Sequence, residues 1–159
     1  NWSEVFWNNS NTMKMMKRED QMKLIKDFLS FADILKLSKE EADIFFENKS
    51  PIQISRFFSK SPDVVITDGG GAIKWFINGY EGISNFGYSG KIIDTTGAGD
   101  AFLAGLVSQI LYLKEPINKS EIQNIVKFAS ICGFLTCLGE GAIEPQPDYD
   151  RVQEFLDLS

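Results

Sequence analysis

The segment D-T-T-G-A-G-D at residues 94–100 constrains this chain more than any other, and it leads directly into small and apolar residues at 101–107. It joins a short apolar strand candidate, residues 91–93, to a helical pattern over residues 102–113. Gly97 and Gly99 can take backbone angles that are closed to other residues, and they let a ligand approach the main chain. The first N–H groups of a helix lack intrahelical partners, and the helix dipole favours negative charge there. The segment therefore predicts an anion site.

Asp100 stands at the lip of this predicted site. A carboxylate would compete with a stored phosphate, so its presence indicates chemistry rather than plain anion binding. It can accept a proton from an alcohol while the helix N–H groups hold the phosphoryl group that the alcohol attacks. The alternative is an ordinary acidic residue in the first turn of a glycine-led helix, which needs no ligand.

The complete segment resembles the second signature of the PfkB (ribokinase-like) carbohydrate kinases, D-T-x-G-A-G-D followed by an aromatic and small residues. Residues 1–7, 32–41, 64–72, 128–133 and 141–147 resemble further stretches of that family, and the chain is most similar to its fructokinase members. Some positions depart from the family pattern. Ser3 replaces an arginine, Ser38 replaces an asparagine, the glycine loop at 69–71 is one residue shorter, and residues 138–140 differ from the usual loop.

The resemblance implies a role for each matching residue. Asp100 would be the base that deprotonates a sugar hydroxyl, and the amides of Gly97, Ala98, Gly99 and Asp100 would form the anion hole around the transferred γ-phosphate. The implied ATP contacts are Ser38, Thr67, Asp68, Gly69, Gly70, Gly71, Gly99 and Ser130. Plainer interpretations exist for these contacts: a capping box, a tight turn after a strand, and the small-residue face of a packed helix.

Two metal sites follow from the resemblance alone. Glu41 would help to place Mg²⁺ through water, although with Ser38 it also fits a capping box. A potassium ion would lie between Asp94, Thr96 and carbonyls near Cys137, Glu140 and Ala142. Oxygen ligands suit such a hard cation, but Asp94 and Thr96 could instead bond only the local backbone.

The order of predicted elements indicates an α/β fold. Helices are expected over residues 18–31, 38–46, 51–61, 102–113 and 120–138, the last with Ser120 as its cap, and a short helix ends the chain. Strands are expected at 33–37, 64–67 and 91–93, and Asn78-Gly79 predicts a hairpin of 72–77 with 80–84. Together with the resemblance, this order predicts a ribokinase-like three-layer sheet with helices on both faces and an antiparallel hairpin at its edge, in the C-terminal part only.

Composition excludes several classes of function. The 159 residues are 43% hydrophobic, enough for one core, and the net charge of −6 argues against nucleic acid or an anionic membrane as the main partner. Without any histidine, a carboxylate must move the proton. Cys132 and Cys137, five residues apart on a predicted helix, are not expected to form a disulfide. No apolar run has membrane-spanning length and no secretory signal is present, so we expect an intracellular enzyme, cytoplasmic with an organelle left open.

The resemblance further implies that residues 1–159 are the C-terminal, ATP-binding and catalytic portion of a kinase whose sugar-binding and lid half is absent. Alone, this portion is expected to be inactive. Its partners would be ATP with Mg²⁺, a sugar and the missing N-terminal half, with a homodimer left open. Fructose is the expected substrate, with ribose, 2-keto-3-deoxygluconate and a nucleoside as alternatives.

The rival hypothesis is an inactive kinase-like subunit or regulator in a larger assembly. The departures from the family pattern favour that rival, whereas the intact Gly-Ala-Gly and Asp100 favour the enzyme.

Overall fold

A computed structural model describes residues 18–113 and 118–158 of the chain. Its four strands form one sheet in the order β1-β2-β3-β4. The strands are β1 (Ile34–Ser38), β2 (Asp63–Thr67), β3 (Ile73–Ile77) and β4 (Tyr80–Ser84). The helices are α3 (Arg18–Leu29), α4 (Lys39–Phe46), α5 (Pro51–Phe57), α6 (Ala98–Tyr112), α7 (Lys119–Thr136) and α8 (Tyr149–Leu158).

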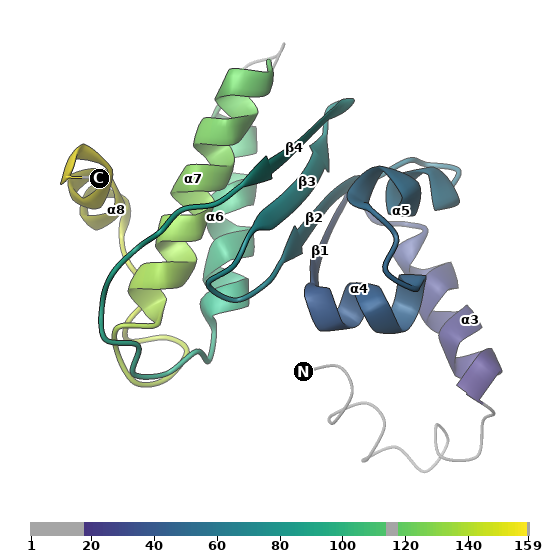
Figure 1. Ribbon diagram of the computed structural model, residues 1–159, viewed down its shortest axis with the longest axis horizontal. Coiled ribbons are helices and arrows are strands. Elements are labelled where there is room, and N and C mark those ends of the chain that lie inside the picture. Colours follow the sequence, from purple (N-terminus) through teal and green to yellow (C-terminus); the bar gives the residue numbers. More distant parts are fainter. Residues whose placement is uncertain (1–17, 114–117, 159) are drawn as a thin grey trace.

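Helices cover both faces of the sheet, which confirms the predicted three layers (Figure 1). On one face, Val65 and Trp75 pack against Phe102 and Leu106 of α6 and against α7. On the other, Leu35 and Leu37 pack against α3, α4 and α5. Helix α8 packs on α7, away from the sheet (Figure 1). The arrangement is a layered α/β architecture of the kind that the resemblance implies.

The alternation of side chains along β1 places Lys36 on the opposite face of the sheet from Leu35 and Leu37. Leu35 and Leu37 are 4% and 5% exposed and point to the face that α4 and α5 cover. Lys36 lies between them and pairs with Val65 in the parallel ladder of β1 and β2. Because neighbouring residues of a strand point to opposite faces, Lys36 points to the α6 face.

The predicted hairpin is confirmed at the β4 edge of the sheet. Asn78 and Gly79 have φ angles of 47° and 78°, as a two-residue turn between right-twisted strands requires. The buried Trp75 indole donates to Ser84 Oγ at 3.1 Å across the two strands. Gly82 lies where an added Cβ would collide with the Trp75 ring, so this strand pair has no room for a larger residue there.

Helices α6 and α7 approach closely because small residues face each other. A Cβ built on Gly105 would lie 2.7 Å from Cys132 Sγ and 3.2 Å from Ala129 Cα. Cys132 and Cys137 are free thiols, as predicted. Burial raises the pKa of Cys132 to about 11, which keeps this thiol protonated and unreactive at neutral pH.

Several predicted helix boundaries were wrong. Helix α6 begins at Ala98 rather than at 102, because Gly97 already serves as its N-cap. Helix α5 ends at Phe57, before the residues expected to terminate it. Ser120 does not cap α7: Asn118 does, since its side chain accepts from Glu121 N at 3.1 Å and Glu121 bonds back to the Asn118 amide at 2.9 Å.

The predicted strand at 91–93 was also wrong. In the part of the chain that the structure describes, no strand lies beside this segment, and Ile92 and Ile93 are 50% and 53% exposed. The Ile93 amide donates instead to the Cys137 carbonyl at 2.8 Å, after the end of α7. The apolar residues at 91–93 therefore form no strand, because no described strand lies beside them as a pairing partner.

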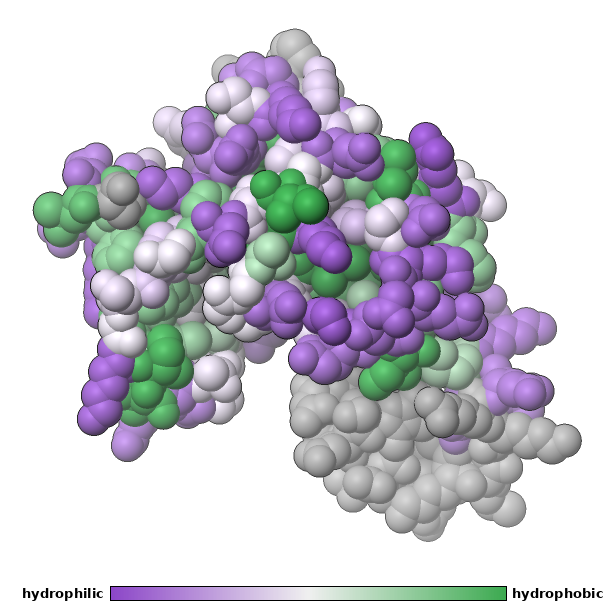
Figure 2. Space-filling model, viewed as in Figure 1, coloured by the Kyte–Doolittle hydropathy of each residue, from purple (hydrophilic) through white to green (hydrophobic). Residues whose placement is uncertain are grey.

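On the face drawn in Figure 2, hydrophobic side chains form separate small groups between hydrophilic ones. None of the described helices combines the length and apolar character needed to cross a bilayer. The stretch at 1–7 that resembles the family, with Ser3, lies outside the described residues.

Candidate functional site

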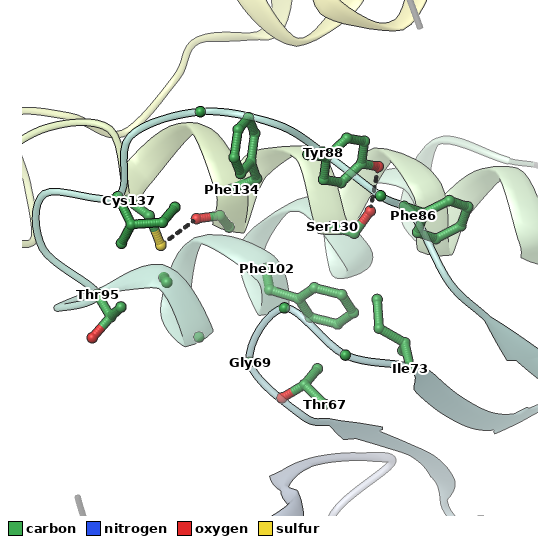
Figure 3. Close-up of a pocket in the computed structure, with 18 of the residues that line it drawn as sticks. Thr67, Gly69, Ile73, Phe86, Tyr88, Thr95, Phe102, Ser130, Phe134 and Cys137 are labelled. Carbon is green, nitrogen blue, oxygen red and sulfur yellow. Dashed lines mark hydrogen bonds between the residues drawn. The ribbon is translucent and has the colours of Figure 1, made fainter.

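A pocket of about 440 Å³ lies where the loop after β2, the segment before α6, and α7 meet (Figure 3). Backbone and small side chains line one side of it, and aromatic rings line another. The lining residues are Lys36, Thr67, Gly69, Gly70, Gly71, Ile73, Phe86, Gly87, Tyr88, Gly90, Ile92, Thr95, Ala98, Gly99, Phe102, Ser130, Gly133, Phe134 and Cys137.

The pocket unites most of the predicted ATP contacts, although they come from three separate parts of the sequence. Thr67, the three glycines 69–71, Gly99 and Ser130 all line it. The remaining predicted site residues lie outside this lining: Ser38, Glu41, Asp68, Asp94, Thr96, Gly97, Asp100, Glu140 and Ala142.

The start of α6 carries open N–H donors. Gly97 has φ 79° and caps the helix without any side-chain bond. The Ala98 amide donates to the Thr95 carbonyl at 3.3 Å, whereas no described residue accepts from the amides of Gly99 and Asp100. The Gly97 amide, at the N-cap, likewise has no acceptor among the described residues. Three of the four expected amides are therefore left as donors for an anion beside the positive end of the helix dipole.

Gly97 and Gly99 have different roles at the start of α6. Only Gly97 needs a backbone angle that other residues avoid, and a Cβ there would lie 2.8 Å from Ala142 Cα. Gly99 is in the first turn of α6 and has no positive φ, so the expectation of a special backbone angle there was wrong. A Cβ on Gly99 would instead occupy space in front of the Lys36 side chain, 2.6 Å from its Nζ.

Asp100 lies in the first turn of α6 with an exposed side chain. Its carboxylate forms no hydrogen bond or ion pair with any other described residue. A carboxylate without a protein partner at the edge of an anion site is free to accept a proton from a ligand.

Asp94 connects the turn before α6 to the loop after α7. Its Oδ1 accepts from Thr96 N at 2.9 Å and Thr96 Oγ1 at 2.7 Å, and its Oδ2 accepts from Gly141 N at 2.9 Å. These bonds, first that from the Thr96 side chain, lower the pKa of Asp94. The local-backbone interpretation of Asp94 and Thr96 thus has a geometric basis.

Ser38 and Glu41 form the predicted capping box of α4. The Ser38 hydroxyl accepts from Glu41 N at 3.1 Å, and Glu41 Oε2 accepts from Ser38 N at 2.8 Å. Ser38 ends β1 beside Thr67 of β2, so both residues lie at the same edge of the sheet. Asp68 begins the next turn, in which its carbonyl accepts from Gly71 N at 2.6 Å.

Tyr88 is a pocket residue that sequence reasoning missed. Its hydroxyl lies 2.7 Å from Ser130 Oγ (Figure 3), and Ser130 Oγ lies 2.7 Å from the Lys127 carbonyl. The Tyr88 hydroxyl also lies 3.5 Å from the Lys127 carbonyl. Either Tyr88 donates to Ser130 and Ser130 to Lys127, or Ser130 donates to Tyr88 and Tyr88 to Lys127. Burial raises the pKa of Tyr88, which keeps its proton in place. In both arrangements the two hydrogens are used within the protein, so both oxygens offer lone pairs to a ligand.

The comparison with known families agrees with this geometry. The description "pfkB family carbohydrate kinase" matches the chain over residues 4–149. The chain belongs to the pfkB family of carbohydrate kinases. The family match thus confirms the resemblance that the segment at 94–100 carries.

Individual pfkB-family relatives include plant and bacterial sugar kinases. Probable fructokinase-6, chloroplastic, of Arabidopsis thaliana is 32% identical over 130 residues, which cover 79% of this chain and 34% of that protein. The ATP-dependent 6-phosphofructokinase of Thermoanaerobacterium thermosaccharolyticum is 30% identical over 156 residues, 94% of this chain and 45% of that protein. The chain thus spans less than half the length of these relatives.

Solved pfkB-type structures share the fold. Fructokinase from Vibrio cholerae O395, in fructose, ADP and calcium ion bound form, has a TM-score of 0.74 and 30% identity, with 87% of this chain and 45% of that chain covered. Fructokinase with bound ATP from Xylella fastidiosa has a TM-score of 0.75 at 21% identity, over 94% of this chain and 50% of that chain, and shows similarity of fold.

The described part of this pfkB-family chain has few side chains that could bind a metal ion together. Among residues 18–113 and 118–158, no three His, Cys, Asp or Glu side chains lie close enough to hold a metal ion. Mg²⁺ commonly keeps several waters and binds one or two carboxylates plus substrate phosphates, so a single Glu41 is compatible with it. At the predicted potassium site, the Cys137 carbonyl accepts from Ile93 N and the Ala142 carbonyl from Gln146 Nε2 at 2.7 Å. Potassium binding stays a prediction.

Proposed function

We propose that this chain is the ATP-binding and catalytic part of a sugar kinase that transfers the γ-phosphoryl group of ATP to a sugar hydroxyl. The observation that carries the proposal is the start of α6. There the amides of Gly97, Gly99 and Asp100 and the Asp100 carboxylate have no bonding partner among the described residues. A scaffold needs neither feature, whereas phosphoryl transfer needs both.

The chemistry assigns one task to each group. Asp100 accepts the proton of the sugar hydroxyl as its oxygen attacks the γ-phosphorus. The amides of Gly99 and Asp100, with the dipole of α6, stabilise the negative charge on the transferred group. The pocket between the glycine loop and the aromatic side holds the nucleotide, with Thr67 at the phosphate end and Ser130 at the base end.

Metal ions have a limited part in this proposal. Mg²⁺ would be held by the nucleotide phosphates and, through water, by Glu41, and it would neutralise phosphate charge during transfer. A potassium ion near Asp94 would add positive charge behind the anion site. Both assignments rest on the family resemblance, and the Glu41 carboxylate keeps one oxygen outside its capping bond.

Fructose is the proposed acceptor. The Arabidopsis relative is named a fructokinase, and the Vibrio cholerae structure holds fructose and ADP. The bacterial relative named ATP-dependent 6-phosphofructokinase adds a phosphorylated sugar to the alternatives, which also include ribose, 2-keto-3-deoxygluconate and a nucleoside. The chloroplastic relative adds a plastid to the cytoplasm as a candidate compartment.

The second candidate is a kinase-like subunit that has lost catalysis. It is favoured by Ser38 in the position of an asparagine and by the shortened glycine loop at 69–71. It predicts nucleotide binding without turnover.

Coupled ADP release by the full-length protein against a panel of sugars decides between these functions. We expect ADP release that depends on the added sugar and is greatest with fructose. Turnover with another sugar corrects the substrate only. Nucleotide binding without turnover on any sugar supports the inactive subunit instead.

A further inference from the structure

Lys36 is a cation at the anion site that belongs to neither the signature nor the nucleotide loop. It lies on β1, where alternation directs its side chain to the α6 face of the sheet. It lines the pocket together with Gly99 and Thr67. The strand thus brings a positive charge to the start of α6 from a position more than sixty residues earlier in the sequence.

The distance between this cation and the helix start is short. A Cβ on Gly99 would lie 2.6 Å from Lys36 Nζ, so the ammonium group occupies the space directly in front of the Gly99 backbone. The Gly99 amide has no acceptor among the described residues. A small anion that bound this amide would therefore contact the ammonium group at the same time.

The structure gives Lys36 no other evident task. It forms no ion pair with a carboxylate of residues 18–113 or 118–158, whereas Lys39, Lys49 and Lys60 each pair with one. Lys36 is half-buried, and its neighbours along the strand, Leu35 and Leu37, point to the opposite face of the sheet. An ammonium group that is partly withdrawn from water and lacks a protein counter-ion is stabilised by a bound anion.

We propose that Lys36 is a catalytic residue that binds the transferred γ-phosphoryl group opposite the amides of Gly99 and Asp100. The inference rests on the proposed kinase function. As the sugar oxygen bonds to the γ-phosphorus, its proton passes to Asp100, the bond from the γ-phosphorus to the bridging oxygen breaks, and that electron pair leaves with ADP. Lys36 takes no part in the proton transfer, and its side chain stabilises the negative charge on the transferred phosphoryl group.

The test compares Lys36→Met with Lys74→Met in the full-length protein. Lys74 lies on β3 with an exposed side chain outside the pocket, so this control removes the same charge from the same sheet. We expect Lys36→Met to lower kcat about 10²-fold, as loss of one transition-state donor does, and Lys74→Met to leave kcat unchanged.

Binding separates a γ-phosphate contact from a general loss of the pocket. Calorimetry with ADP and with a non-hydrolysable ATP analogue should show the Lys36→Met affinity for the analogue reduced about tenfold and that for ADP nearly unchanged. Equal losses for both nucleotides, or unchanged kcat, would overturn the proposal. Lys36→Gln gives a second neutral variant if Lys36→Met unfolds, and Lys36→Arg should restore part of the analogue affinity.

The proposed kinase function and the proposed role of Lys36 can be disproved separately. If the wild-type protein binds the analogue but phosphorylates no sugar, the kinase function fails, and the ratio of the two affinities still decides the role of Lys36. If the wild-type protein binds neither nucleotide, both fail.

Discussion

Asp94 Oδ2 accepts a hydrogen bond from the amide of Gly141 at 2.9 Å, across 47 residues of sequence. This bond ties the turn that opens α6 to the loop that follows α7. With the two bonds from Thr96, it holds both oxygens of an otherwise exposed carboxylate. The position of the proposed anion site therefore depends on the loop that follows α7.

The Asp94 contacts predict a particular dependence of stability on pH. Because they lower the pKa of Asp94 below its ordinary 3.8, the carboxylate stabilises the folded state above that pH, and the contribution is lost as pH falls through the folded-state pKa. We expect Asp94→Asn to unfold at lower urea concentration than wild type at pH 6. The difference between the two should shrink as the pH approaches 3.

Asp157→Asn is the matched control for this titration, because Asp157 is exposed on α8 and far along the chain from the site. Its urea midpoint should follow wild type at every pH. A gap between Asp94→Asn and wild type that stays constant from pH 6 to pH 3 would contradict the proposed contribution.

Asp100 carries the proposed proton transfer. Asp100→Asn is nearly isosteric but cannot accept the proton, so kcat of the full-length enzyme should fall by at least about 10²-fold with the fold intact. Steady-state ADP release and circular dichroism measure the two effects. Wild-type turnover in Asp100→Asn would remove Asp100 from the role of base.

Gly97 is the position at which the turn cannot accept a side chain. Its φ of 79° and the 2.8 Å approach of a Cβ to Ala142 Cα both oppose any larger residue. Gly97→Ala should lower the free energy of unfolding by about 1–3 kcal/mol through backbone strain, with additional loss from the contact. Chemical denaturation measures the change.

Gly70→Ala is the control for this substitution. No atom of the described residues lies within 4 Å of a Cβ at Gly70, and the φ angle of Gly70 is not positive. Equal stability losses in the two variants would show that the Gly97 turn has no special backbone requirement.

The hydrogen bonds of Tyr88 and Ser130 predict which nucleotide is preferred. With both hydrogens used by Ser130, Tyr88 and the Lys127 carbonyl, the two oxygens offer lone pairs at the proposed base end of the pocket. Lone pairs suit the exocyclic amino group of adenine and oppose the oxygen at the same position of guanine. We expect the full-length protein to prefer ATP to GTP. Tyr88→Phe should reduce the preference, measured as a ratio of kcat/KM values, about tenfold.

Tyr112→Phe serves as the control, because Tyr112 is 81% exposed at the end of α6 and lies outside the pocket. It should leave the ratio unchanged. A Tyr88→Phe enzyme with the wild-type ratio would show that this hydroxyl does not contact the base.

Local chemistry explains which features could be predicted from the sequence. The hairpin at Asn78-Gly79 and the capping box of Ser38 with Glu41 depend on residues a few positions apart, and both were correct. The strand at 91–93 failed because a strand needs a partner that apolar residues alone do not specify.

The missed pocket residues depend on tertiary packing. Tyr88 reaches Ser130 across 42 residues, and no short motif encodes that contact. Lys36 had a signal in the sequence: a lysine between two inward-facing leucines must point to the other face of the strand. Interpreting that signal required knowing that α6 covers the face.

Helix α6 begins without a side-chain cap, and its first open amides belong to Gly99 and Asp100. A phosphate bound there would complete the helix as a capping residue normally does. Deuterium uptake at these amides should then slow when nucleotide is added, while the middle of α7 keeps its own rate. The nucleotide would thereby act as a structural component of the chain, and cellular ATP concentration would set how often the first turn of α6 frays.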